Sequence, residues 1–152
     1  MFGINESLPF KPIRIAVLTV SDTRTLDNDT SGDVLAQRIE AAGHNLADRV
    51  LLRDDKDKIQ AQVKAWIGQP DIDAVVSTGG TGLTGRDVTV EAVTPLFEKT
   101  IDGFSVIFHQ VSFQSVGLST LQSRACAGLA NSTFIFCLPG SNGAVKDGWD
   151  KV

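Results

Sequence analysis

The sequence has few of the features that mark secreted, membrane or nucleic-acid-binding proteins. It holds only 2 cysteines in 152 residues, and its 14 Lys and Arg are outnumbered by 18 Asp and Glu, so the net charge is −4. That charge has the wrong sign for a surface that neutralises a nucleic-acid backbone. No apolar run approaches the roughly 18 residues of a membrane span, and the N-terminus lacks a basic segment followed by an apolar one. We expect a cytoplasmic protein that binds neither nucleic acid nor a membrane.

The remaining composition is that of a globular chain. Hydrophobic residues make up 42% of the sequence and charged residues 21%, which excludes intrinsic disorder and collagen-like structure. A chain of this length buries about 68–70% of its unfolded surface and needs no disulfide or structural metal. Cys126 and Cys137 lack a CxxC spacing and are surrounded by small or apolar residues, so two buried thiols are favoured over a redox pair. We expect a single domain spanning residues 1–152.

The hydrophobic pattern alternates between strands and helices. Continuous apolar runs are typical of strands buried on both faces, and they cover Arg14–Val20, Ala74–Thr78 and Thr133–Leu138, with a weaker run at Leu46–Leu52. Helical spacing links three sets of residues: Leu35, Ile39 and Ala42; Ile59, Val63, Trp66 and Ile67; and Phe104, Ile107, Phe108 and Val111. Two further helices are expected near Val88 and from Gly143 to Val152. The alternation predicts the α/β class, as a three-layer α/β/α sandwich with a mostly parallel sheet.

Polar or glycine-rich residues follow each predicted strand. In parallel α/β sheets, ligands bind beyond the carboxyl ends of the strands, where these residues would meet. The loop from Ser21 to Gly32 is long for such a connection and carries three aspartates, which predicts a binding loop or a mobile one. The four segments are Ser21-Asp22-Thr23, Arg53-Asp54-Asp55, Gly79-Gly80-Thr81-Gly82 and Pro139-Gly140-Ser141-Asn142-Gly143.

The segment from Thr78 to Asp87 holds four glycines between a strand and a helix start. Free backbone N–H groups at such a place favour an anion, which predicts a phosphate cradle, although the glycines can also serve only a tight turn. Its GxGxxG match follows the third strand, and no acidic residue ends a next strand about 20 residues on, so it is a weak indication of dinucleotide binding. A P-loop is excluded because Arg86 and Asp87 replace the required Lys and Ser or Thr.

Two carboxylates, Asp54 and Asp87, follow neighbouring strands beside this glycine loop. Each precedes a predicted helix, as Asp55 does, so capping of the helix N-terminus is an alternative to catalysis. Their placement also suits Mg²⁺ held against nucleotide phosphates, because Mg²⁺ takes few protein ligands. Capping and metal binding can coexist.

Five segments occur in the order found in one protein family. They are Thr19-Val20-Ser21-Asp22-Thr23; Thr78-Gly79-Gly80-Thr81-Gly82; Arg86-Asp87-Val88-Thr89 with Glu91-Ala92; Ser123-Arg124-Ala125 with Gly128; and Leu138-Pro139-Gly140-Ser141. With them the chain resembles the MoaB/Mog family of molybdenum cofactor biosynthesis proteins over about residues 13 to 150, and the bacterial MoaB branch more than the Mog branch. It departs from the commonest bacterial pattern at Val106 and His109, where many relatives have an acidic and a basic side chain.

The resemblance implies an activity and a set of residues. The family adenylylates molybdopterin: a terminal phosphate of molybdopterin attacks the α-phosphorus of Mg-ATP, and pyrophosphate leaves before molybdate or tungstate is inserted. Asp54 and Asp87 match the two essential acidic positions and are assigned to catalysis and to Mg²⁺. Since the substrate phosphate is the nucleophile, no catalytic Ser or Cys is required. The residues assigned to nucleotide or pterin binding are Ser21, Asp22, Thr78, Gly79, Gly80, Thr81, Gly82, Ser112, Ser123, Pro139, Gly140, Ser141 and Asn142.

The resemblance also implies partners. Molybdopterin and ATP are the expected small-molecule substrates, and the molybdenum insertase is an expected protein partner. Relatives form trimers or hexamers, and Phe108, Phe113 and Val116 form an apolar stripe that favours a homotrimer or homohexamer here. The alternative to an enzyme is a non-catalytic molybdopterin-binding or carrier protein of the same fold.

Overall fold

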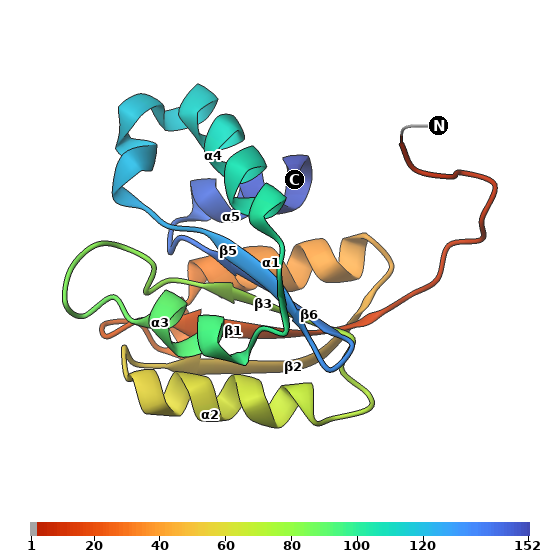
Figure 1. Ribbon diagram of the computed structural model, residues 1–152, viewed down its shortest axis with the longest axis horizontal. Helices are drawn as coiled ribbons and strands as arrows, with labels where there is room; N and C mark the ends of the chain where they lie inside the picture. Colours follow the sequence, from red (N-terminus) through yellow and green to blue (C-terminus); the bar gives the residue numbers. More distant parts are fainter. Residues whose placement is uncertain (1–2) are drawn as a thin grey trace.

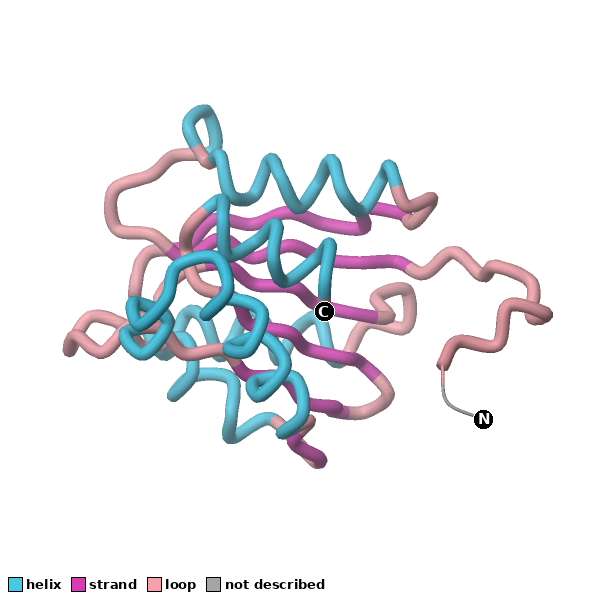
Figure 2. The backbone as a smooth tube through the Cα atoms, turned by 90° about the horizontal axis from the view of Figure 1, so that it is seen from above, coloured by secondary structure: helices cyan, strands magenta, loops and turns pink. Residues whose placement is uncertain are grey.

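The computed structural model describes residues 3–152 and contains a six-stranded sheet with helices on both faces (Figure 1). The strand order is β2-β1-β3-β6-β5-β4, and the strands lie side by side with a twist across the sheet (Figure 2). Neighbours from β2 to β6 pair in parallel, whereas β5 runs antiparallel to both β6 and β4. The strands are β1 (Arg14–Val20), β2 (Asn45–Leu52), β3 (Ala74–Thr78), β4 (Lys99–Thr100), β5 (Cys126–Ala130) and β6 (Thr133–Leu138).

The helices divide between the two faces of the sheet. The helices are α1 (Thr30–Ala41), α2 (Lys56–Ile67), α3 (Thr89–Val93), α4 (Asp102–Val116) and α5 (Asn142–Lys151), with 3₁₀ turns at Leu26–Asn28, Thr94–Leu96 and Gly117–Gln122. One hydrophobic core joins α2 and α3 to the sheet around Trp66, and the other joins α1, α4 and α5 to it around Phe108. This arrangement confirms the three-layer α/β/α sandwich. No helix within residues 3–152 has the length and apolar character to cross a membrane.

The predicted cores are largely correct, with three errors at the ends of elements or on outer faces. Ala42 is exposed because α1 ends at Ala41 and places it at the cap. Ile107 is 45% exposed, since it lies beside Phe108 on the outer face of α4. Phe134 is 46% exposed, so burial on both faces is wrong at the start of β6, where the strand leaves its hairpin.

Two strands, β4 and β5, have no counterpart in the sequence prediction. β5 is a Cys-Ala-Gly-Leu-Ala segment, and β4 is only 2 residues long. Ala and Gly are depleted in strands, so β5 carries no strand pattern. β4 is too short to show one. The β5–β6 hairpin turns through Asn131 and Ser132, whose φ values of 45° and 68° suit the two-residue turns of tight hairpins. The edge of the sheet is therefore antiparallel.

A buried aspartate anchors the far end of the loop after β1. Asp29 is fully buried and accepts hydrogen bonds from Thr19 Oγ1 at 2.7 Å and from the Gly32 N–H at 3.0 Å. Arg49 on β2 forms an ion pair with the same carboxylate at 2.9 Å. A buried carboxylate needs such partners to offset its lost hydration. Asp29 therefore anchors the far end of the loop that begins at Ser21.

Asp73 and Arg14 tie the start of β3 to the start of β1. Asp73 Oδ2 accepts from the Arg14 backbone N–H at 2.7 Å and from Nε at 2.9 Å, and Oδ1 accepts from Nη2 at 2.9 Å. These hydrogen bonds lower the pKa of Asp73 to about 2. Because the folded-state pKa is depressed, the stabilisation is present above the unfolded pKa and is lost as pH falls from about 4 to about 2.

We expect Asp73→Asn to lower the free energy of unfolding by about 1 kcal/mol at pH 7, a value reduced because both side chains are partly exposed. The difference from the wild type should shrink as pH falls from about 4 to about 2. Urea unfolding at pH 7 and across this acidic range measures the difference. Asp71→Asn, which removes the charge of an exposed neighbour, is the control and should change stability by less than about 0.5 kcal/mol. A difference that stays constant with pH would contradict the assignment.

Candidate functional site

The loops at the carboxyl ends of β3 and β6 pack directly on each other. Thr78 Oγ1 donates to the Pro139 carbonyl at 3.1 Å, and the Gly79 N–H donates to the Leu138 carbonyl at 3.0 Å. A Cβ at Gly140 would lie 3.0 Å from the Gly79 Cα. The glycine loop, residues 78–82, and the loop of residues 139–142 therefore form one continuous floor.

The glycine loop leaves backbone donors free. The N–H groups of Gly80, Thr81 and Gly82 donate to no acceptor within residues 3–152. Its carbonyls, in contrast, are held: Thr89 Oγ1 donates to Gly79 at 2.9 Å, and the Thr89 N–H donates to Gly80 at 3.0 Å. Free N–H groups in a fixed loop suit an anion such as a phosphate oxygen.

The candidate carboxylates lie against this loop, one on each side of Thr81. A Cβ at Gly80 would come within 2.9 Å of Asp54 Oδ1, and a Cβ at Gly82 within 2.6 Å of Asp87 Oδ2. The absence of side chains at these two glycines is therefore what gives the carboxylates room. Asp54 and Asp87, far apart in sequence, meet at one place.

Capping is not the role of either carboxylate. Asp55, not Asp54, caps α2 and accepts from the Lys58 N–H at 3.1 Å. The residue at the N-cap of α3 is Val88, which makes no side-chain cap bond, so the alternative that Asp87 caps this helix is wrong. Asp87 Oδ2 instead accepts from the Thr84 N–H at 3.0 Å and from Thr84 Oγ1 at 2.6 Å, closing the turn before the helix.

Asp54 combines burial with an unpaired acceptor. Its Oδ1 is buried and has no hydrogen-bond partner. Burial, followed by the nearby charges of Asp22 and Asp87, raises its pKa above the ordinary value. A buried acceptor without a partner is costly to fold, and a bound cation would satisfy it. The site thus concentrates negative charge that the fold alone does not neutralise.

Asp22 bridges the loops after β1, β2 and β3. Its Oδ1 accepts from the Asp54 N–H at 3.3 Å, and its Oδ2 accepts from Arg86 Nε at 2.6 Å. The Arg86 guanidinium lowers the pKa of Asp22. Ser21 Oγ accepts from the Arg24 N–H at 3.2 Å, which orders the start of the same loop.

The residues fit Mg²⁺ only as a shared site with phosphates. No group of three or more His, Cys, Asp or Glu side chains within residues 3–152 is arranged to hold a metal by itself. Mg²⁺ commonly takes one or two carboxylates and completes its shell with waters and substrate phosphates. Asp54 and Asp87 match that requirement, and the unpaired Asp54 Oδ1 is the atom that most needs a cation.

A polar cleft of about 580 Å³ opens from Asp54 toward β2. Four basic side chains that the sequence prediction did not single out line it with the acidic ones; they are Arg24, Arg53, Lys58 and Arg86. Three of the four follow the strand ends that the sequence predicted as ligand sites. We call it the cationic cleft, and its size and charge suit a polyphosphate.

A separate cavity of about 230 Å³ lies between α4 and α5 and adjoins the glycine loop through Pro139, whose carbonyl accepts from Thr78 Oγ1. It is lined by Ser112, Ser115, Val116, Ser119, Thr120, Ser123, Pro139, Ser141, Gly143, Ala144 and Asp147, and we call it the serine cavity. A small hollow of about 50 Å³, lined in part by Ser21, Thr78 and Gly140, lies between it and the cationic cleft.

Six of the predicted site residues line one of the two spaces, whereas Asp87 and residues 79–82 line neither. Ser112, Ser123, Pro139 and Ser141 line the serine cavity, whereas Asp22 and Asp54 line the cationic cleft. Asn142 belongs to neither lining: its Oδ1 accepts from Thr30 Oγ1 and Ser31 Oγ, both at 3.1 Å, and ties the loop after β6 to α1.

Arg124 is a functional candidate that the sequence did not single out. Its Nε donates to the Thr81 carbonyl at 3.1 Å, and its guanidinium forms an ion pair with Glu91. Its Nη2 also reaches the Asp87 carbonyl at 3.5 Å. Arg124 thus holds both the glycine loop and the Asp87 turn from a distant segment. Only its place in the family motif indicated it.

The other candidates from the sequence have structural surroundings. Cys126 and Cys137 are free thiols in register across β5 and β6; Cys137 is buried as expected, whereas Cys126 is only partly buried. His109 Nδ1 lies 3.0 Å from Thr120 Oγ1, and His44 Nδ1 accepts from the Ile13 N–H at 3.2 Å. Neither histidine lines the cationic cleft.

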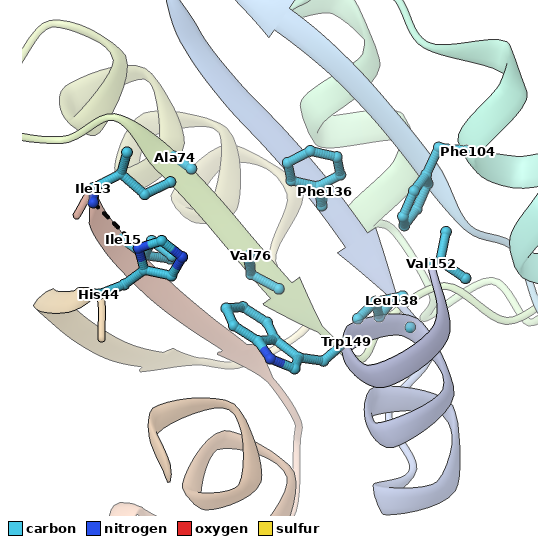
Figure 3. Close-up of a pocket in the computed structure, with 11 residues that line it drawn as sticks. Ile13, Ile15, His44, Ala74, Val76, Phe104, Phe136, Leu138, Trp149 and Val152 are labelled. Atoms are coloured by element: carbon cyan, nitrogen blue, oxygen red, sulfur yellow. Dashed lines mark hydrogen bonds between the residues drawn. The ribbon is translucent and has the colours of Figure 1, made fainter. Parts of the chain in front are cut away.

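A third cavity, of about 280 Å³, is apolar and lies on the sheet face below α5 (Figure 3). Trp149 and Phe136 point into it, and His44 lies at its edge (Figure 3). Neither candidate carboxylate, Asp54 or Asp87, is in its lining.

Comparisons with known proteins agree with this architecture. A family model described as "probable molybdopterin binding domain" matches residues 16–152. Molybdenum cofactor biosynthesis protein B of Escherichia coli K12 is 46% identical over 146 residues, covering 96% of this chain and 86% of that protein. The protein of the same name from Bacillus subtilis is 44% identical over 141 residues, covering 92% and 83%.

Solved structures of molybdenum and tungsten cofactor biosynthesis proteins have the same fold as this chain. A crystal structure of molybdenum cofactor biosynthesis protein B superposes with a TM-score of 0.90 at 40% identity, covering 93% of this chain and 89% of that one. The tungsten cofactor synthesizing protein MoaB from Pyrococcus furiosus superposes with a TM-score of 0.82 at 33% identity, covering 93% and 91%. The chain belongs to the MoaB/Mog family of molybdenum cofactor biosynthesis proteins.

Proposed function

We propose that the chain acts in molybdenum cofactor biosynthesis and adenylylates molybdopterin with Mg-ATP. An oxygen of the terminal molybdopterin phosphate attacks the ATP α-phosphorus, the bond from that phosphorus to the β-bridging oxygen breaks, and pyrophosphate leaves. One observation carries the proposal: the glycine loop contacts both Asp54, which lines the cationic cleft, and Pro139, which lines the hydroxyl-lined cavity. Two substrates bound in these two spaces would both lie near the loop.

The protein's part in this reaction is alignment and charge neutralisation. The free N–H groups of the glycine loop would hold phosphate oxygens, and Arg24, Arg53, Lys58 and Arg86 would balance the triphosphate charge. Asp54 and Asp87 would hold Mg²⁺, which supplies further positive charge at the phosphates. No side-chain nucleophile is needed, because the attacking oxygen belongs to the substrate.

Incubation with molybdopterin, ATP and Mg²⁺, followed by measurement of pyrophosphate, tests the proposal. Release of pyrophosphate that requires all three components is the expected result. Molybdopterin binding without pyrophosphate release would support the alternative, a carrier of the same fold. The adenylylated product would then pass to the molybdenum insertase, the protein partner that we propose.

We also propose a trimer or hexamer, because α4 and the turn after it expose apolar side chains. Val106, Ile107, Phe113, Val116, Leu118 and Leu121 are each 45–72% exposed. Phe108 is not part of this face, contrary to the sequence prediction, because it is fully buried in the core. An exposed apolar face of this kind marks an interface.

The double change of Phe113 and Leu121 to serine should convert the assembly into monomers of 16.2 kDa in sedimentation equilibrium. Serine removes apolar contact area without touching the core, so the fold should persist. Ile4→Ser is the control, since Ile4 lies on the N-terminal segment that extends away from the sheet (Figure 2). A wild type that sediments as a monomer at micromolar concentration would refute the assembly.

A further inference from the structure

The serine cavity contains one carboxylate, Asp147, to which the proposed reaction assigns no role. Asp147 lies on α5 and is 8% exposed, although the rest of the lining is hydroxyl-bearing or apolar. Its Oδ1 accepts from Lys151 Nζ at 2.8 Å. The Ser115 hydroxyl, which also lines the cavity, is a second donor to this carboxylate. A carboxylate can accept about four hydrogen bonds, so Asp147 keeps acceptor positions beside these two donors.

The charge state of Asp147 is fixed by its surroundings. Burial raises the pKa of Asp147, but the Lys151 ammonium and the Ser115 hydroxyl lower it further, so its pKa lies below the ordinary value. The carboxylate is ionised at neutral pH and accepts hydrogen bonds only. Lys151 already balances the charge of Asp147. A ligand that contacts Asp147 in the serine cavity is therefore expected to offer a neutral hydrogen-bond donor, not a second cation.

The shape of the cavity limits that donor to a small ring. Its volume of about 230 Å³ is below the roughly 300–1,000 Å³ of pockets that hold drug-sized ligands. Val116, Pro139 and Ala144 supply apolar walls, and five serine or threonine hydroxyls surround them: Ser112, Ser115, Ser119, Thr120 and Ser123, with Ser141 on the loop after β6. A flat heterocycle with several polar edges matches this lining.

We propose that Asp147 recognises the 2-amino-4-oxopyrimidine edge of the pterin ring, accepting from N3–H and from the 2-amino group. Two adjacent N–H donors on one edge match the two oxygens of a carboxylate. This inference rests on the proposed function, which requires a pterin next to the glycine loop. Guanine carries the same edge, but a nucleotide fits the larger cationic cleft, where the phosphate-binding side chains lie.

Equilibrium dialysis with three probes tests the assignment: pterin, lumazine and guanosine. Lumazine has a 2-oxo group in place of the 2-amino group, so it presents an acceptor to the carboxylate. The wild type should bind pterin at least about tenfold more tightly than lumazine. Asp147→Asn keeps the size of the side chain but turns one acceptor into a donor. It should weaken pterin binding about tenfold or more and abolish the preference over lumazine.

Asp150→Asn is the matched control. Asp150 lies on the same helix, pairs with Arg38 at 2.9 Å, and does not line the serine cavity. It loses the same charge, so its pterin affinity should stay within about threefold of the wild type. Thermal melting of all three proteins checks that Asp147→Asn remains folded.

Two outcomes would overturn the assignment. If Asp147→Asn binds pterin as the wild type does, Asp147 does not recognise the ring, and pyrophosphate release by the wild type then leaves the proposed function intact. If the wild type prefers guanosine to pterin, the cavity belongs to a guanine base. Absence of both pterin binding and pyrophosphate release would refute the proposed function together with the assignment.

Discussion

Asp54→Asn and Asp87→Asn should each reduce pyrophosphate release by about 10²–10³-fold, the scale of losing one electrostatic contact to a transition state. Both carboxylates touch the glycine loop, and the amide that replaces them is neutral and a weaker ligand for Mg²⁺. Raising the Mg²⁺ concentration should recover part of the lost rate, because the defect lies in metal and phosphate positioning. Initial rates over a series of Mg²⁺ concentrations measure both effects.

Asp55→Asn is the control for these variants. Asp55 is adjacent in sequence and caps α2, and asparagine caps a helix about as well as aspartate. The control should retain activity within about threefold of the wild type. Equal loss in Asp54→Asn and Asp55→Asn would mean that the start of α2, not the Asp54 charge, is what the reaction needs.

Asp54→Asn should reduce activity without reducing stability. Asp54 Oδ1 is buried without a partner, and Asp22 and Asp87 repel its charge. Asparagine removes that repulsion, so Asp54→Asn should melt at the wild-type temperature or above it. Residues that oppose folding and are nevertheless present are typical of functional sites. A melting temperature lowered by several degrees would instead assign Asp54 to the fold.

The sequence predicted which strand-end loops contain the candidate residues better than it predicted the contacts among them. Continuous apolar runs identified β1, β3 and β6, and the rule that ligands bind beyond strand ends then located Asp54 and the glycine loop. This inference works because hydrophobic patterning and strand direction are local properties. Family motifs added Asp87, which spacing alone left undecided between a cap and a ligand.

The contacts that fix the site are non-local, and no periodicity reveals them. Arg124 meets Thr81 and Glu91 across separations of 43 and 33 residues. β5 is rich in Ala and Gly, so its own sequence does not favour a strand. Its antiparallel pairing with β6 is what holds it in the sheet. The basic side chains of the cationic cleft come from three different loops and from α2, so only the folded chain groups them.

Gly79→Ala should lower the free energy of unfolding by about 3 kcal/mol or more, because two costs coincide at this residue. Gly79 has a φ of 97°, which is unfavourable for any residue with a Cβ. A Cβ there would also lie 2.1 Å from the Val20 carbonyl oxygen, a backbone atom of the central strand β1. β1 is buried and paired on both sides, so it has no room to move. The melting temperature should fall by roughly 6–12 °C for a chain of this size.

Gly85→Ala separates this close contact from the flexibility of the loop. Gly85 lies in the same connection, but a Cβ there would meet no atom within 4 Å, so its melting temperature should stay within about 2 °C of the wild type. If both variants melt alike, the approach of Gly79 to Val20 is not what selects glycine. If Gly79→Ala alone is destabilised, the close approach of this residue to β1 is what requires glycine. Loss of activity on changing Gly79 would then report a displaced loop, whereas loss on changing Asp54 or Asp87 reports missing charge.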